Sequence, residues 1–282
     1  MALAINTNMA SIGAQRQLQK STNALGKTFE RLSSGLRINR AADDAAGMSI
    51  ATRMTAQVRG TNQAIRNSND AISAVQVAEG ALDETNNALQ RIRELAVQGA
   101  NDTLIAGDRE DLQREITQLV YEVQRISSET EFNNQRVVNG SFATKKFHVG
   151  PDGGQTIAVT VNAASVRALG VNSTNAKLYS ATMTATQMQS MANGLIGRVD
   201  SALDSVSDIR SNLGSYQNRF EAVIANLSSI VESTQAARSR ILDADIASET
   251  ANLTRNAILQ QAGTAILAQA NQQPQIALQL LG

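Results

Sequence analysis

The most restrictive feature of this sequence is an apolar stripe in its C-terminal half that keeps heptad spacing from residue 188 to residue 241. At about 1.5 Å per residue, a single helix over this range is on the order of 80 Å long. That length is typical of a coiled coil or a helical bundle, and an ordinary core-facing stripe is the alternative. The stripe consists of Met188, Met191, Leu195, Val199, Ala202, Val206, Ile209, Leu213, Tyr216, Phe220, Val223, Leu227, Ile230, Thr234, Ala237 and Ile241.

The N-terminal half supplies partners for this helix. The chain has only two prolines, Pro151 and Pro274, so the long stretches between them and before them lack the strongest helix breaker. Residues 44–99 carry a second heptad seam, which consists of Val58, Ile65, Ile72, Val75, Leu82, Leu89 and Ala96. A shorter helix is expected to start at an N-cap on Asp108 and to present one apolar face. We therefore expect a mainly α fold, a long antiparallel helical bundle or coiled-coil rod.

A small β-hairpin region is expected near residues 132–175, where the apolar period changes to two. The sequence Pro-Asp-Gly-Gly at 151–154 supplies the turn, and Asn139-Gly140 marks a candidate second hairpin over residues 137–142. Residues 162–185 are rich in Ser, Thr, Asn and Ala, and we expect them to form an exposed tip. The alternating apolar residues of the first hairpin are Phe147, Val149, Ile157, Val159 and Val161.

The composition excludes several classes of function. Lys and Arg total 25 and Asp and Glu total 25, so no net positive charge attracts nucleic acid or an anionic membrane. With no cysteine and one histidine, the chain has neither the ligands for a zinc site nor a catalytic triad. No apolar run approaches the roughly 20 residues of a membrane span, and no nucleotide-binding or hydrolase motif is present. We therefore expect no enzyme, no cofactor, no nucleic-acid partner and no membrane insertion.

Two acidic groups are expected to cap helices. Asp43-Asp44 precedes Ala45-Ala46-Gly47, where a helix restarts. Asp243, Asp245 and Glu249 lack the glycine and the ligand spacing of a calcium loop.

The outermost residues at both ends of the chain carry almost no charge. The first charged side chain is Arg16, and Arg255 is the only one after Thr250, yet both ends have apolar stripes. Exposed helices normally carry charge for solubility. The ends are therefore expected to be buried, either against each other or by neighbouring copies of the chain. Residues 1–40 hold six basic side chains against one acidic, and residues 243–282 hold three acidic against one basic, which favours pairing of the two ends. Because two thin helices bury little area, we predict that they are disordered in the monomer and fold on assembly.

The sequence of both ends resembles that of the bacterial flagellins. The matching N-terminal segments are Ala2-Leu3-Ala4-Ile5-Asn6-Thr7-Asn8, Arg31-Leu32-Ser33-Ser34-Gly35-Leu36-Arg37-Ile38-Asn39 and Ala42-Asp43-Asp44-Ala45-Ala46-Gly47-Met48. The matching C-terminal segments are Ile258-Leu259-Gln260-Gln261-Ala262-Gly263-Thr264, Ala268-Gln269-Ala270-Asn271-Gln272 and Leu278-Gln279-Leu280-Leu281.

This resemblance implies an architecture and a function. It implies filament-core helices at 1–44 and 243–282, which pair as a coaxial coiled coil on assembly, and a rod domain at 45–242. The implied function is a structural subunit that self-assembles as a homopolymer into the extracellular flagellar filament for swimming motility. The resemblance also implies unfolded export through the flagellar type III apparatus, and an export chaperone, a filament cap and hook-junction proteins as partners.

The resemblance also implies site residues. The assembly core comprises Ile5, Met9, Ile12, Leu259, Ile266, Leu278, Leu280 and Leu281. A stretch that resembles the segment bound by host Toll-like flagellin receptors includes Gln90, Arg91 and Leu95, with Glu115 on the next helix as a supporting acidic residue. Because Arg91 and Leu95 are four residues apart, they are expected to place a cation beside an apolar anchor on one face. The alternative is a packing surface between subunits. The C-terminal leucines resemble those sensed by cytosolic innate receptors.

Two other functions compete with a filament subunit. A hook-filament junction protein has related end helices. A soluble coiled-coil binding module belongs to a different class, and it predicts charged, solvated termini.

Overall fold

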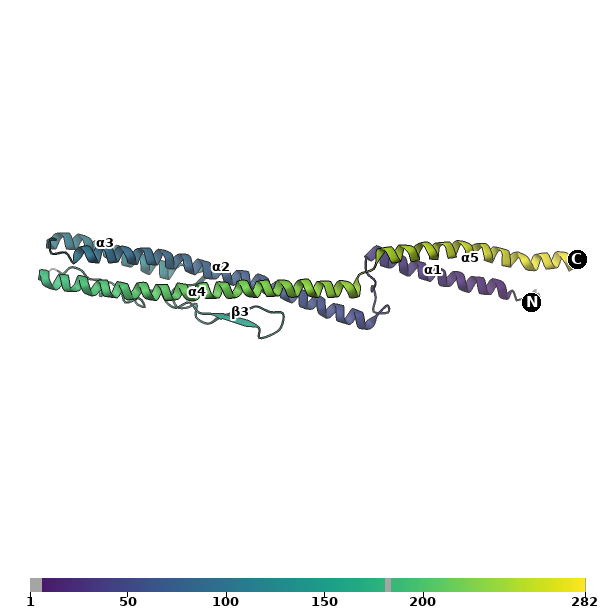
Figure 1. Cartoon of the computed structure of the whole chain (residues 1–282), viewed down its shortest axis with the longest axis horizontal. Coiled ribbons are helices and arrows are strands. Elements are labelled where there is room, and N and C mark those ends of the chain that lie inside the picture. The colour runs from purple at the N-terminus through teal and green to yellow at the C-terminus, as the bar shows by residue number, and fades with distance from the viewer. Residues whose placement is uncertain (1–6, 181–183, 282) are drawn as a thin grey trace. The chain divides into compact units, whose positions relative to one another are not determined.

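The computed structural model describes residues 7–180 and 184–281, with Ala185 and residues 274–281 described as backbone only. Its elements are α1 (Met9–Ser34), α2 (Ala45–Gly99), α3 (Ala106–Glu129), β1 (Glu131–Phe132), β2 (Gln135–Arg136), β3 (Lys145–His148), β4 (Thr156–Val159), α4 (Ala185–Leu242) and α5 (Ile246–Leu281) (Figure 1). The mainly α fold with a small β-hairpin region is confirmed. Among the described residues, no helix is both long and apolar enough to cross a membrane.

The chain divides into two compact units. The terminal unit comprises residues 1–58 and 232–282, and the central unit comprises residues 59–231. This division falls inside α2 and α4, whereas the boundaries expected at residues 44 and 243 fall between helices. The expected boundaries therefore stay a prediction.

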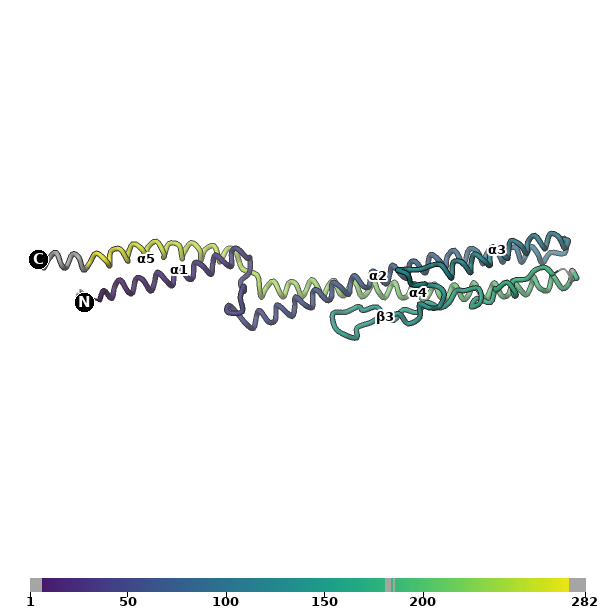
Figure 2. Tube along the Cα trace, turned by 180° about the vertical axis from the view of Figure 1, so that it is seen from behind, coloured from purple at the N-terminus to yellow at the C-terminus, as the bar shows by residue number. Residues whose placement is uncertain are grey.

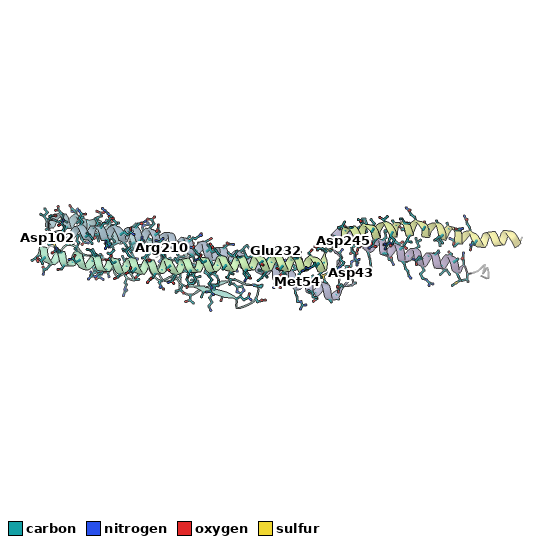
Figure 3. The ribbon with its side chains drawn as sticks, viewed as in Figure 1. Asp43, Met54, Asp102, Arg210, Glu232 and Asp245 are labelled. Carbon is teal, nitrogen blue, oxygen red and sulfur yellow. The ribbon has the colours of Figure 1, made fainter. Side chains whose placement is uncertain are left out.

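In the central unit, α2, α3 and α4 lie side by side around one apolar core (Figure 2). The heptad stripe of α4 faces this core, where Leu195, Val199, Val206, Leu213 and Phe220 are fully buried. Many buried residues of α2 are alanines, whose small side chains let the helices approach closely. Arg210 of α4, labelled in Figure 3, forms an ion pair with Asp83 of α2 at 3.1 Å. The long helices of the sequence prediction are thus present and packed together.

The first predicted hairpin is confirmed, and it docks against two helices. Strands β3 and β4 are antiparallel, with Phe147 opposite Ile157. The ring of Phe147 meets that of Phe220 of α4 edge to face, with 6.0 Å between centroids. On α2, Asn67 Nδ2 donates to the His148 carbonyl at 3.0 Å, and Gly60 leaves room for the turn residue Pro151.

The second predicted hairpin is wrong in its position. The short β1–β2 hairpin precedes residues 137–142, and its turn residues Asn133 and Asn134 have φ of 50° and 59°. Asparagine tolerates this left-handed region better than most residues, so the pair can replace glycine. Asn139-Gly140 does form a turn, with Gly140 at φ 91°, but no strands flank it.

The prediction of an exposed tip over residues 162–185 is also wrong. In the described part of this segment, Ala164, Val166, Leu169, Val171, Ala176 and Leu178 are buried in the core. The side chain of Gln113 on α3 holds the segment in place. Its Nε2 donates to the Ala176 carbonyl at 3.1 Å, and its Oε1 accepts from the backbone N–H groups of Leu178 and, at 3.3 Å, Tyr179.

The connection between α2 and α3 contains a buried arginine. Arg109 Nε donates to the Gly99 carbonyl at 3.2 Å and Nη2 donates to the Asn101 carbonyl at 3.0 Å, which satisfies groups at the end of α2. The predicted N-cap on Asp108 is displaced, because α3 begins at Ala106. Asp108 instead lies in the first turn, where Oδ2 accepts from the Ile105 N–H at 3.1 Å.

Candidate functional site

The terminal unit pairs α1 with α5, and the fully buried residues of this seam are small or polar. On α1, Ser11, Ser21 and Thr28 are the buried residues. Ser11 Oγ donates to Asn271 Oδ1 at 2.7 Å, and Gly263 of α5 lies against Leu18. The seam on α5 repeats at steps of three and four and includes Glu249, Leu253, Asn256, Gln260, Gly263, Leu267 and Ala270. This seam buries few large apolar side chains.

One ion pair crosses the same seam. Arg31 Nη1 lies 3.1 Å from Glu249 Oε1, and the Glu249 side chain is only 11% exposed. The carboxylate is therefore partly desolvated and paired, as the opposite charges of the two ends predict.

Large apolar side chains of α1 and α5 remain exposed in the single chain. Their exposed fractions range from 41% to 70%, and the residues are Met9, Ile12, Phe29, Ile246, Ile258, Leu259 and Ile266. We call this set, taken together, the outward apolar face. Scattered exposed apolar residues are ordinary, but seven large ones on two helices, of which α5 is almost without charge, are characteristic of an interface.

The predicted assembly residues separate into two groups. Met9, Ile12, Leu259 and Ile266 belong to the outward apolar face. Ile5 lies outside the described residues, as do the side chains of Leu278, Leu280 and Leu281. On α5, Ile246 and Ile258 are also exposed, although they were not among the predicted assembly residues. Their signal in the sequence is the large apolar side chain on a helix almost without charge.

The two connections of the terminal unit are tied together by backbone hydrogen bonds. Arg37 N donates to the Leu242 carbonyl at 2.6 Å, and Ala244 N donates to the Gly35 carbonyl at 3.0 Å. Gly35 adopts φ 70° at the end of α1, where most other residues are strained.

Two of the predicted acidic caps, Asp44 and Asp245, are confirmed, whereas Asp243 accepts from Ser239 Oγ and Glu249 pairs with Arg31. Asp44 Oδ1 accepts from Gly47 N at 2.9 Å, and Asp245 Oδ1 accepts from Ala247 N at 2.9 Å. The labelled Asp43 and Asp245 both lie at these connections in Figure 3. The backbone N–H groups of Arg40 and Asn39 lower the pKa of Asp43 from its ordinary 3.8. No group of three potential metal ligands occurs in the described ranges.

The predicted receptor residues lie on α2 and α3 of the central unit. Arg91 Nη2 lies 2.8 Å from Glu115 Oε1, and Nη1 lies 3.0 Å from Glu94 Oε2. The hydrogen bond to Glu94 raises the pKa of Arg91 most, and the hydrogen bond to Glu115 raises it further. Gln90, Arg91 and Glu115 are exposed, whereas Leu95 is 1% exposed and packs in the core. The expectation that Leu95 stands beside Arg91 as a surface anchor is therefore wrong for this conformation.

An open depression of about 500 Å³ adjoins Arg91. Its rim is charged and its floor is apolar, and its lining residues are Glu84, Asn87, Ala88, Arg91, Leu119, Glu122, Arg125 and Ile126. Arg125 bonds both Glu122 and Glu129, and the first of these bonds lowers the pKa of Glu122. The depression is shallow and mostly paired in charge, so it has the character of a contact surface and not of a reaction site.

Family comparisons decide between the candidate functions. A model of the bacterial flagellin N-terminal helical region matches residues 5–143, and one of the C-terminal helical region matches residues 196–281. The chain belongs to the flagellin family. A flagellin of Halalkalibacterium halodurans is 45% identical over 277 residues, covering 98% of this chain and 99% of the relative. A Bacillus subtilis flagellin is 42% identical over 301 residues, with 98% and 99% covered.

As a flagellin, the chain is a structural subunit of the bacterial flagellar filament, and flagellins are not enzymes. A solved structure of a putative flagellar hook-associated protein from Vibrio parahaemolyticus matches with a TM-score of 0.60. It covers 71% of this chain and 100% of that protein at 13% identity, so the likeness concerns the fold alone.

Proposed function

We propose that this flagellin assembles because neighbouring copies cover the outward apolar face of α1 and α5. The observation that supports the proposal is that the helix pair buries mainly polar and small residues, with half-buried leucines such as Leu253 and Leu267 beside them, while seven large apolar residues stay exposed. A pair meant to be stable alone would bury its apolar residues in the seam. Complete burial of half-exposed residues such as Ile266 contributes about 1 kcal/mol each, so the face as a whole supplies several kcal/mol to assembly.

The test is polymerisation of a variant with Phe29→Ser, Ile258→Ser and Ile266→Ser. These side chains are largely exposed in the single chain, so the variant keeps the folded central unit while losing the contact surface. We expect long filaments from the original chain in negative-stain electron microscopy and none from the variant. A matched control, Gln261→Ser with Gln269→Ser, changes exposed polar residues of α5 and should still assemble. Normal filaments from the apolar variant would contradict the proposal.

The proposal includes three functional segments, with residues 1–44 and 243–282 as filament core and residues 45–242 as the rod around it. It also includes terminal helices that are disordered in the free monomer and fold on assembly, because their seam alone buries little apolar area. Amide hydrogen exchange tests this directly. We expect fast exchange over α1 and α5 in verified monomers and strong protection in filaments, and protection in both states would contradict it.

We further propose the export route and accessory partners that the family resemblance implies. The chain leaves the cell unfolded through the flagellar type III apparatus, with a chaperone on the C-terminal helix, a cap at the growing tip and hook-junction proteins at the base. The low charge of the ends and the absence of cysteine support a chain that travels unfolded. Deletion of residues 243–282 should abolish binding to the chaperone, and retained binding would contradict that assignment.

We also propose that the free subunit is a ligand of host flagellin receptors through Gln90, Arg91 and Glu115, with Leu95 supporting Arg91 from the core. The exposed ion pairs of Arg91 present a fixed guanidinium on this surface, which supports the assignment. Arg91→Ala should weaken receptor binding at least tenfold, since an arginine anchor carries about 2 kcal/mol or more. Arg114→Ala is the matched control, because Arg114 is an exposed α3 arginine paired with Asp111. Equal binding by both variants would contradict the proposal. We assign the binding of cytosolic innate receptors to Leu278, Leu280 and Leu281. Serine variants of these leucines test this assignment.

A further inference from the structure

The turn at Asn139-Gly140 brings together the groups of a self-modification reaction. An asparagine followed by glycine can cyclise, because no side chain on the glycine hinders attack of its backbone nitrogen on the asparagine Cγ. We propose that Asn139 undergoes spontaneous deamidation through a succinimide formed with the Gly140 nitrogen. The chain holds a second Asn-Gly pair at Asn193-Gly194, which serves as an internal comparison.

The reaction uses only water as co-reactant. Solvent base removes the Gly140 N–H proton as that nitrogen bonds to Asn139 Cγ, and negative charge collects on Oδ1. The Cγ–Nδ2 bond then breaks, and Nδ2 leaves as ammonia after taking a proton from water. Water opens the ring either at Cγ, which gives aspartate, or at the backbone carbonyl carbon, which gives isoaspartate.

The turn supplies donors to the oxygen on which this charge develops. Ser141 N donates to Asn139 Oδ1 at 2.9 Å, and Ser141 Oγ lies 2.7 Å from the same atom. A backbone N–H can only donate, so the atom that faces it must be the oxygen of the amide and not its nitrogen. Two donors on a developing oxyanion lower the barrier to attack in the manner of an oxyanion hole. The hydroxyl also lies 3.1 Å from the Arg136 carbonyl, which competes for its single proton.

The attacking and leaving nitrogens are both unrestrained. In the described part of the chain, neither the Gly140 N–H nor Asn139 Nδ2 donates a hydrogen bond. The nucleophile therefore breaks no bond to approach Cγ, and ammonia breaks none to leave. Gly140 has φ 91°, and a Cβ at this position would lie 3.0 Å from that of Ala163, so glycine is required here on two counts.

Asn193-Gly194 lacks these features although it is more exposed. Gly194 lies inside α4, where the backbone N–H donates to the carbonyl four residues earlier. Attack by this nitrogen requires the helix to open locally. We therefore expect the Asn-Gly pair in the turn to react readily and the Asn-Gly pair in the helix to be protected.

The test is peptide mass spectrometry of the full-length chain during incubation at mildly alkaline pH, with aspartyl and isoaspartyl products separated by chromatography. In the native protein we expect Asn139 to convert on the order of tenfold or more faster than Asn193. In guanidinium chloride the two rates should become similar, because both pairs are then free. Native conversion at Asn139 that is no faster than at Asn193, or slower than in denaturant, would overturn the proposal.

Ser141→Ala tests the assigned donor. It removes the hydroxyl but keeps the backbone N–H, so native conversion at Asn139 should slow about fivefold, the effect of one hydrogen bond. The rate in denaturant should not change, which separates the effect of the turn from that of the local sequence. An unchanged native rate would overturn the role of the hydroxyl.

Discussion

Replacement of Gln113 by leucine tests how the segment after the β3–β4 hairpin is held on the helices. The Gln113 amide is bonded to the Ala176 carbonyl and to the backbone N–H groups of Leu178 and Tyr179. Ala176 and Leu178 are buried, so their released backbone groups lose a partner where water does not reach. Each such group costs about 1–3 kcal/mol, and leucine recovers about 1 kcal/mol by apolar burial. We expect a net loss of about 2–4 kcal/mol.

The assay is urea unfolding followed by circular dichroism, together with amide exchange at Leu178 and Tyr179. With a denaturant slope of about 2 kcal/mol per molar, the midpoint should fall by about 1 M or more, and both amides should lose protection. Gln124→Leu is the matched control on the exposed face of α3 and should change stability by about 0.5 kcal/mol or less. An unchanged midpoint with unchanged exchange at Leu178 would refute this account of the segment.

Three further perturbations test other parts of the structure. Gly99→Ala places a Cβ within 3.0 Å of the fully buried Leu178 and should destabilise the protein by about 1–3 kcal/mol. Gly80→Ala places its Cβ in open space on α2 and should stabilise the protein by about 0.5–1 kcal/mol. Urea unfolding measures both changes. The pKa of Asp43 in the folded protein is lowered from its ordinary value of 3.8. The stabilisation from its hydrogen bonds to backbone N–H groups is therefore fully present above pH 3.8, and it is lost as the pH falls through the lowered pKa. A nuclear magnetic resonance titration should therefore give Asp43 a midpoint below 3.8, and a midpoint at or above it would refute the hydrogen bonds from Asn39 and Arg40.

The long helices could be predicted because heptad spacing and the scarcity of proline act locally. The stripe of α4 places Val199, Val206 and Leu213 in the core as the spacing requires. The β1–β2 turn was missed because Asn133-Asn134 carries no glycine, yet both residues adopt positive φ. Positive φ at asparagine is an exception, and the composition of the segment does not predict it.

Other features depend on tertiary contacts that no local pattern encodes. The segment after β4 looks polar, but its scattered apolar residues enter the core because Gln113 satisfies its backbone. Leu95 and Arg91 are four residues apart, yet the helix turns one into the core and the other to solvent, because α3 and α4 cover only one side of α2.

The terminal helices show the main limit of periodicity. Leu259 and Ile266 of α5, both predicted for the assembly core, are exposed, whereas Ala270 of the same helix is buried in the seam with α1. Hydrophobic spacing indicates that a helix face is buried but does not identify the partner that buries it. The residues of α5 that pack against α1 could therefore be identified only from the structure.

Thiol labelling at position 266 tests the central claim most directly, because the chain contains no cysteine of its own. Ile266→Cys places a single thiol on the outward apolar face, and Ala270→Cys places one in the buried seam as a control. In free subunits, whose terminal helices we propose to be disordered, we expect rapid labelling at both positions. In filaments we expect both thiols to be protected. Equal labelling at 266 in subunits and in filaments would contradict the claim that neighbouring copies cover this face.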